Sequence, residues 1–153
     1  FRFMAQASHM SEEDRERFLL RFEEEPKESF AGLCVMGGIF SEGIDLTQDR
    51  LIGAMIVGTG IPQVCNEREI LKQYFGAEGF DYAYLYPGMN KVLQSAGRVI
   101  RTEKDKGVIL LMDERFQSPH YRKMFPREWS DCRRCTMENV TELLTEFWKK
   151  DPT

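Results

Sequence analysis

The sequence lacks a long apolar run and a surplus of basic residues. No apolar stretch reaches the roughly 18 residues that a membrane helix requires. The chain has 25 acidic and 21 basic residues and a net charge of −4, so any binding to a phosphate backbone must be local. The first ten residues do not have the pattern of a signal peptide. We therefore expect a cytoplasmic protein with no membrane partner.

The sequence is also poor in metal-ligating clusters. It has four cysteines and two histidines, and only Cys132 and Cys135 are closely spaced. A single CxxC without a second pair or nearby histidines is weak support for a metal site. Reduced thiols of a cytosolic protein are the favoured interpretation, and a metal or redox protein built on this pair is the weaker one. We predict no metal site in this chain, and the sequence assigns no role to the pair.

Three short apolar runs predict buried strands, at residues 33–36, 54–57 and 108–112. The stretches between them carry helical patterns, about 67–75, which Gly76 ends, and about 90–101, which follows Pro87 and Gly88. Continuous apolar strands that alternate with helices are typical of a parallel sheet covered on both faces. With 153 residues, the sequence predicts one α/β domain.

The two ends of the chain carry further signals. Ser11 and the acids after it predict a helix cap and a first helix over Ser11 to Phe22. An amphipathic helix is expected after Thr136. The letters Ser8-His9-Met10 resemble a cloning remnant. Residues 1–10 are therefore expected to be a tag remnant, and residues 11–153 the domain proper.

The predicted helix over 90–101 has two different faces. At about 100° per residue, the apolar side chains gather on one face, and Gln94, Arg98 and Arg101 lie opposite them. A guanidinium group matches phosphate oxygens, so this stripe suits a polyanion. Gly97 weakens a helix interior by about 1 kcal/mol relative to alanine, and close approach of a backbone or ligand would explain it. A solvated surface is the competing interpretation of two arginines alone.

A second segment of interest is Gly37–Asp45, directly after the first predicted strand. Gly37 and Gly38 allow a tight turn, and Ser41 can cap a helical turn whose N–H groups face a ligand. The carboxylates of Glu42 and Asp45 can accept hydrogen bonds from sugar hydroxyls or pair with arginines. A glycine-rich turn with exposed acids is the competing interpretation.

Together the two segments resemble known motifs in the right order. Residues 37–46 resemble motif V of superfamily 2 helicases of the XPD/DinG type, and residues 94–101 resemble their motif VI, QxxGRxxR. Asp105 and residues 107–115 are similar to the strand that follows motif VI. The resemblance covers about residues 30–129.

This resemblance implies the second RecA-like motor domain of a DNA helicase that moves 5′ to 3′ on single-stranded DNA. It places Arg98, Arg101 and Gln94 in catalysis, with at least one arginine acting as a finger on the phosphates of ATP. It places Gly97, Glu42 and Asp45 at the nucleotide, and it implies nucleic-acid contacts for three residues of motif V: Gly38, Ser41 and Gly43.

The sequence departs from a complete helicase. It has no GxxxxGK[ST] loop, no DEAH-like motif and no cluster-bearing insert. We expect ATP, the Mg²⁺ held by the first motor domain, and an iron–sulfur cluster to belong to the rest of the full-length protein. Strands upstream of motif V also look absent, which predicts truncation on the N-terminal side, an inactive isolated fragment, and self-association through an exposed sheet edge.

Two interpretations of function therefore stand. The first is a motor fragment that binds single-stranded DNA and works with the first motor domain of the same polypeptide. The alternative is a nucleic-acid or protein-binding module that keeps a helicase-like fold without motor function. A phosphate loop far upstream in the same reading frame would favour the motor.

Overall fold

The computed structural model describes residues 1–22, 26–40, 46, 50–103 and 105–149. The chain divides into two compact units, Phe1–Phe116 and Gln117–Thr153. The elements of the first unit are β1 (Arg2–Ala5), α1 (Glu12–Leu19), β2 (Phe30–Leu33), β3 (Gly53–Val57), α2 (Asn66–Tyr74), the 3₁₀ turn η2 (Gly76–Glu78), the π-helix η3 (Asp81–Leu85), α3 (Tyr86–Ala96) and β4 (Val108–Met112). The 3₁₀ turn η4 (Glu114–Gln117) spans the boundary, and α4 (Pro119–Arg122), the 3₁₀ turn η5 (Arg127–Trp129) and α5 (Val140–Lys149) follow.

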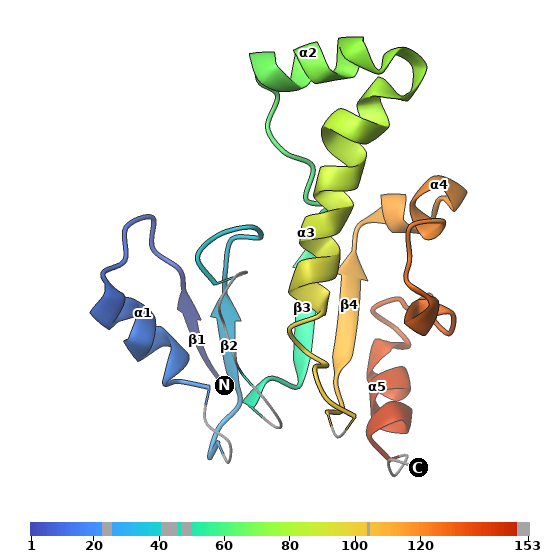
Figure 1. Ribbon diagram of the computed structural model, residues 1–153. Coiled ribbons are helices and arrows are strands. Elements are labelled where there is room, and N and C mark those ends of the chain that lie inside the picture. Colours follow the sequence, from blue (N-terminus) through green and yellow to red (C-terminus); the bar gives the residue numbers. More distant parts are fainter. Residues whose placement is uncertain (23–25, 41–45, 47–49, 104, 150–153) are drawn as a thin grey trace. The chain divides into compact units, whose positions relative to one another are not determined.

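The strands form two parallel pairs (Figure 1). In the first pair Arg2 of β1 lies opposite Phe30 of β2, and in the second Gly53 of β3 lies opposite Val108 of β4. The prediction of an α/β fold with parallel strands is confirmed. The predicted strand over 108–112 agrees with β4 at both ends, and β3 begins one residue before the run over 54–57.

The exclusion of residues 1–10 from the fold is wrong for β1. The amide of Arg2 donates to the carbonyl of Ser29 at 2.9 Å, and the amide of Gln6 donates to the carbonyl of Leu33 at 2.8 Å. β1 is therefore an upstream strand of the kind that the sequence seemed to lack. Its partner lies about 28 residues further along the chain, and a pairing over that distance leaves no local pattern in the sequence.

The predicted burial of the strands is only partly right. β2 begins three residues before the run over 33–36, so Cys34 and Val35 lie beyond it and are exposed. In β3 the side chain of Ile56 is buried, whereas Met55 and Val57 are 76% and 72% exposed. In β3, therefore, one face is covered and the other is exposed and apolar.

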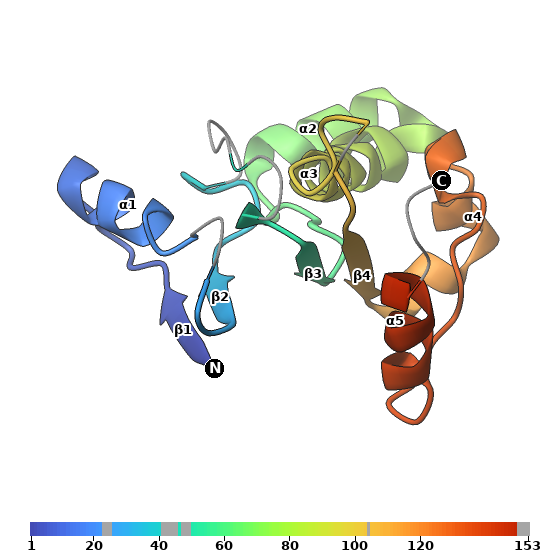
Figure 2. The ribbon, with the colours of Figure 1, turned by 90° about the horizontal axis from the view of Figure 1, so that it is seen from below.

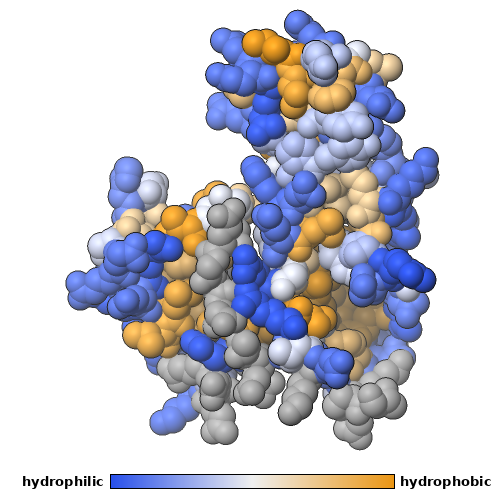
Figure 3. All heavy atoms as spheres, viewed as in Figure 1, coloured by the Kyte–Doolittle hydropathy of each residue, from blue (hydrophilic) through white to orange (hydrophobic). Residues whose placement is uncertain are grey.

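The helix α1 packs against β1 and β2 through aromatic rings. Its N-cap is Ser11, whose hydroxyl accepts from the amide of Asp14 at 3.1 Å, while Asp14 accepts from Ser11 in return. This capping box confirms the predicted helix start. Phe18 is fully buried, and its ring stacks on Phe40 with centroids 4.4 Å apart. Hydrophilic side chains cover the outer side of α1 (Figure 3).

The helix α3 starts earlier than predicted, because Pro87 and Gly88 do not break it. The π-helix Asp81–Leu85 leads directly into α3, with Pro87 in the first turn. Proline has no N–H to donate to the carbonyl four residues earlier, which is that of Ala83. The guanidinium of Arg68 in α2 donates to this carbonyl at 2.7 Å instead. A side chain thus replaces the missing helical hydrogen bond.

A second contact ties α2 to the π-helix. The hydroxyl of Tyr84 donates to a carboxylate oxygen of Glu69 at 2.6 Å. This hydrogen bond, with help from desolvation, raises the pKa of Tyr84 to about 12. The same bond and the ammonium of Lys72 lower the pKa of Glu69. The helical segment that precedes α3 is therefore held to α2 by two side chains.

One face of α3 is buried along its length, and α3 lies along β3 and β4 (Figure 2). The buried positions are Gly88, Met89, Val92 and Ala96. A close backbone crossing sets its position, because a Cβ on Gly88 would lie 2.7 Å from the carbonyl oxygen of Thr59, and a Cβ on Gly60 would lie 2.8 Å from that of Gly88. The loop after β3 therefore presses on the first turns of α3. None of the helices in the described part of the chain is long and apolar enough to cross a membrane.

This crossing predicts a specific difference between two glycines with positive φ. Gly58 has φ 83° and open space around its missing Cβ, whereas Gly60 has φ 66° and faces Gly88. We expect Gly58→Ala to lower the free energy of unfolding by roughly 1–2 kcal/mol, through backbone strain alone. Gly60→Ala should cost about 1–3 kcal/mol more, since it also forces α3 away. Urea denaturation measures both, and equal losses would contradict the close crossing.

Candidate functional site

The arginines of the QxxGRxxR segment do not lie on a helix, which corrects the predicted stripe. α3 ends at Ala96 with Gly97 as its C-cap, so only Gln94 stays on the exposed side of the helix. Arg98 follows in a turn and Arg101 lies beyond it. A Cβ on Gly97 would meet only the carbonyls of Leu93 and Gln94 at 3.3 Å and 3.7 Å. Gly97 has φ −65°, a conformation open to any residue, so the helix end does not require glycine. The close approach of a ligand there stays a prediction.

The turn that carries the arginines is anchored by Val99. Its side chain is 2% exposed, and it fills the space beside Gly107, where a Cβ would collide with Val99 Cγ1. Gly107 precedes β4, whose first amide, that of Val108, donates to the carbonyl of Ile52 at 3.0 Å. The sequence correctly placed Val92, Ala96 and Val99 in the core, but Ile100 is half exposed. A buried residue between the two arginines thus holds their turn against the start of β4.

Asp105 fixes the far side of the same turn. Its carboxylate Oδ2 accepts from the amides of Arg101 and Thr102, each at 2.8 Å. The amide of Asp105 donates to the carbonyl of Thr102 at 3.2 Å, which closes the loop. Sequence reasoning noted Asp105 only as part of a resemblance. Its spacing of four residues from Arg101 is the signal for this backbone cap.

The glycine turn after β2 lies beside α3. Gly37 has φ 78°, and a Cβ on it would lie 3.2 Å from both Cδ and Cε of Lys91. Lys91 stands three residues before Gln94, on the same side of the helix. The methylenes of Lys91 cover Gly37, and its Nζ lies 3.6 Å from the same built Cβ. The ammonium group of Lys91 in α3 therefore lies beside the glycine turn, which begins the predicted segment Gly37–Asp45. No sequence motif points to Lys91.

Gln6 supports this glycine turn from the other side. Its carbonyl oxygen Oε1 accepts from the amide of Val35 at 3.0 Å, and the amide of Gly38 donates to the carbonyl of Val35 at 2.9 Å. A Cβ on Gly38 would lie 2.9 Å from that carbonyl and 3.2 Å from Nε2 of Gln6. Gly38 is thus needed for close approach. No sequence pattern points to Gln6, which lies within the segment expected to be a tag remnant.

The structure describes only part of the segment Gly37–Asp45, and it is this part that lies beside α3. Gly38 and the cover of Lys91 on Gly37 belong to that part. Ser41, Glu42, Gly43 and Asp45 lie outside the described residues. Arg98 is half-buried and Arg101 is exposed, and both take part in interactions. Within the described ranges no group of three His, Cys, Asp or Glu side chains meets at metal-binding geometry.

The anchoring by Asp105 is testable by amide exchange. Asp105→Ala removes the acceptor of two amides, so exchange of Arg101 and Thr102 should speed up by about 5- to 150-fold, the factor for roughly 1–3 kcal/mol. Asp105→Asn keeps one acceptor oxygen, so its exchange rates should lie between those of the wild type and the alanine variant. The amides of Leu110 and Leu111 in β4 serve as controls. Unchanged exchange at Arg101 in the alanine variant would contradict the cap.

Comparison with known proteins finds relatives of this chain. The sequence model of the helicase C-terminal domain matches residues 1–132. A probable ATP-dependent helicase of Methanocaldococcus jannaschii is 31% identical over 101 residues, which cover 58% of this chain and 16% of that protein. The ATP-dependent DNA helicase DinG of Photobacterium profundum is 32% identical over 117 residues, 73% of this chain and 17% of its own length.

The human regulator of telomere elongation helicase 1 is 30% identical over 106 residues, 61% of this chain and 9% of its own length. The chain thus spans less than a fifth of each of these relatives. The matched residues include β1, the glycine turn after β2 and the segment from Gln94 to Arg101. The chain belongs to the helicase C-terminal domain family, of the DinG/XPD type within superfamily 2.

Proposed function

We propose that this chain supplies the arginine-finger half of the ATP site of a 5′ to 3′ DNA helicase. The observation that carries the proposal is the anchored turn after α3, in which Val99 and Asp105 hold the backbone between and beside Arg98 and Arg101. A group that acts on a developing charge must be positioned before the reaction begins. A turn fixed at a buried valine and at a double backbone cap provides that positioning.

The guanidinium groups of Arg98 and Arg101 suit the task chemically. A guanidinium group offers five N–H donors in a planar fork. Such donors stabilise the charge spread over the oxygens of a transferring phosphoryl group. Gln94 lies on the exposed side of α3 one turn earlier, where its amide can orient the attacking water. Gly97, between them, ends the helix and lets the chain turn.

The glycine turn after β2 is proposed to couple nucleotide and DNA. Gly38, Ser41 and Gly43 would contact single-stranded DNA, and Glu42 and Asp45 would serve the nucleotide side, as the resemblance to motif V implies. The cover of Lys91 on Gly37 supports a mechanical link between this turn and α3. A shift of α3 on hydrolysis would move the turn through that contact.

The remaining parts of the ATP site are proposed to come from the first motor domain of the same polypeptide. That domain would hold the phosphate loop and the Mg²⁺, and an iron–sulfur cluster would also belong to the rest of the full-length protein. The ligand set for Mg²⁺ fits carboxylates and phosphate oxygens, and the described residues offer no such cluster. Self-association of the isolated chain is proposed to use an exposed sheet edge, and the exposed apolar side chains of β3, Met55 and Val57, would add to it.

Replacement of either arginine tests the proposal in the complete helicase. Arg98→Ala or Arg101→Ala should lower DNA-stimulated kcat for ATP hydrolysis by about 10³- to 10⁵-fold, with folding intact by circular dichroism. Arg17→Ala is the matched control, because Arg17 is an exposed arginine of α1 paired with Glu13 and Asp14. Normal turnover in both site variants would sink the motor assignment and favour the binding module.

The isolated chain should not hydrolyse ATP. Without a phosphate loop in its 153 residues, it holds no cradle for the β- and γ-phosphates. We expect no ATP hydrolysis above a buffer blank in a coupled assay, with or without single-stranded DNA. A rate that persists through repeated purification, and that is lost in Arg98→Ala, would show that the chain is more than half a site.

A further inference from the structure

The second unit contains a pocket that the helicase motifs do not use. It has a volume of about 290 Å³ and is lined by Arg122, Phe125, Pro126, Arg127, Trp129 and Ser130. All of these residues belong to the unit Gln117–Thr153. The pocket forms between two single turns, α4 and η5, which succeed each other along the chain.

An aromatic pair forms the middle of this pocket. The rings of Phe125 and Trp129 meet edge to face, with centroids 5.2 Å apart and planes at 77°. Both are half-buried, so each keeps ring surface for another group. The amide of Trp129 donates to the carbonyl of Pro126 at 3.0 Å, which closes the turn that presents the indole. Two rigid rings with open surface form a platform on which flat groups can stack.

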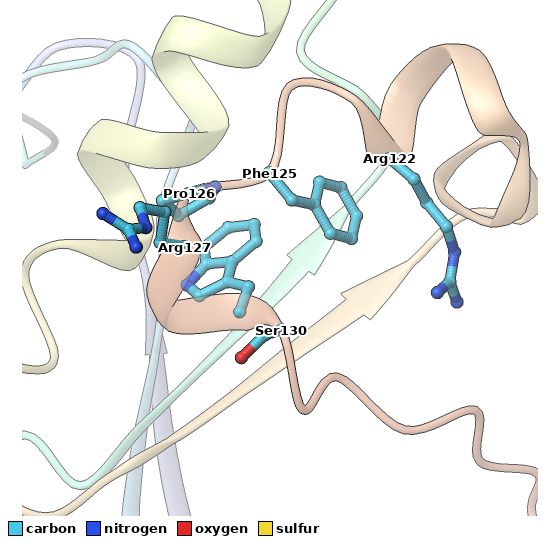
Figure 4. A pocket seen from close by; sticks show the side chains of 6 residues that line it. Arg122, Phe125, Pro126, Arg127 and Ser130 are labelled. Atoms are coloured by element: carbon cyan, nitrogen blue, oxygen red, sulfur yellow. The ribbon is translucent and has the colours of Figure 1, made fainter.

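Arginines flank the aromatic pair. Figure 4 shows Arg122 and Arg127 on opposite sides of Phe125. Both are exposed, and no acid among the described residues forms an ion pair with either. In contrast, Arg133 outside the pocket pairs with Glu146 at 3.4 Å. The pocket thus combines stacking surface with two cations that are available to an anion.

The local charge distinguishes this region from the rest of the chain. Residues 117–137 contain five Lys or Arg against two acids, although the whole chain has a net charge of −4. A ligand drawn to this region must be anionic, and one that fills the pocket must also be flat and aromatic. A nucleotide of a single strand has both properties, because its base stacks and its phosphates face cations.

We propose that this pocket is a stacking subsite for single-stranded nucleic acid. One base lies on Trp129 and Phe125, and the flanking phosphates meet Arg122 and Arg127. The inference rests on the proposed function, since it assigns to the helicase a further contact with its DNA. An acidic peptide would satisfy the arginines but leave the aromatic platform unused.

Affinity measurements on the complete helicase test the subsite. Trp129→Ala should weaken binding of a fluorescent oligothymidylate by about 5- to 150-fold, and Trp129→Phe should retain most of the affinity. Arg127→Ala should reduce the slope of log K against log salt by about 0.7, the value for one phosphate contact on a single strand. Arg17→Ala, in α1 of the first unit, is the matched control and should change neither quantity.

A crosslink locates the contact independently of any substitution. Ultraviolet irradiation of the wild-type complex with an iodouracil-containing strand should join the strand to Trp129 or Phe125, as read by mass spectrometry. Crosslinks confined to other residues, with an unchanged salt slope in Arg127→Ala, would overturn the subsite. So would protection of Trp129 by oligoglutamate but not by oligothymidylate, which would identify a peptide site.

These outcomes are separable from those of the proposed function. A wild-type helicase without DNA-stimulated ATP hydrolysis would refute the motor. Normal DNA-stimulated hydrolysis and unchanged DNA affinity in both Trp129→Ala and Arg127→Ala would refute only the subsite.

Discussion

The packing of Val99 against Gly107 is the constraint on which the candidate site depends. Val99 lies between the two arginines in sequence, and its burial leaves no freedom in how the turn after α3 meets the start of β4. A larger residue than glycine at position 107 would push this turn outward, because its Cβ would collide with the valine. Asp105 then caps the backbone beyond. The backbone at Arg98 and Arg101 is thus held by the residues around them.

The sequence predicts well those features whose cause is local. The Ser11 cap, the apolar run of β4 and the end of α2 before Gly76 all depend on residues within one or two turns, and all agree with the structure. Hydrophobic periodicity did not predict the end of α3 at Gly97, because the period reports only which side chains are buried. Val99 is buried although it lies beyond the end of the helix. The predicted helix break at Pro87 is wrong, because the guanidinium of Arg68 replaces the hydrogen bond that proline cannot make. Arg68 lies 19 residues upstream, so no local pattern reveals this.

The sequence motifs name the residues of the candidate site, but not the residues that hold them in place. The motifs supplied Gln94, Arg98 and Arg101, whereas Lys91 and Gln6 emerged only from contacts across the fold. Such supporting residues belong to no recognisable spacing, because their partners are distant in sequence. The pocket of the second unit shows the same limit, since Phe125 and Trp129 look like ordinary core aromatics until their half-exposed rings are seen between two arginines.

The contact between Lys91 and Gly37 has a consequence for how this family can diverge. Any side chain at position 37 would have to displace the lysine methylenes, and the positive φ there disfavours one in any case. The lysine methylenes are flexible and could yield by a few tenths of an ångström, so the positive φ at position 37 is the stronger constraint. In a set of aligned relatives, position 37 should therefore stay glycine, while position 91, 54 residues further along, can vary among long side chains that cover it.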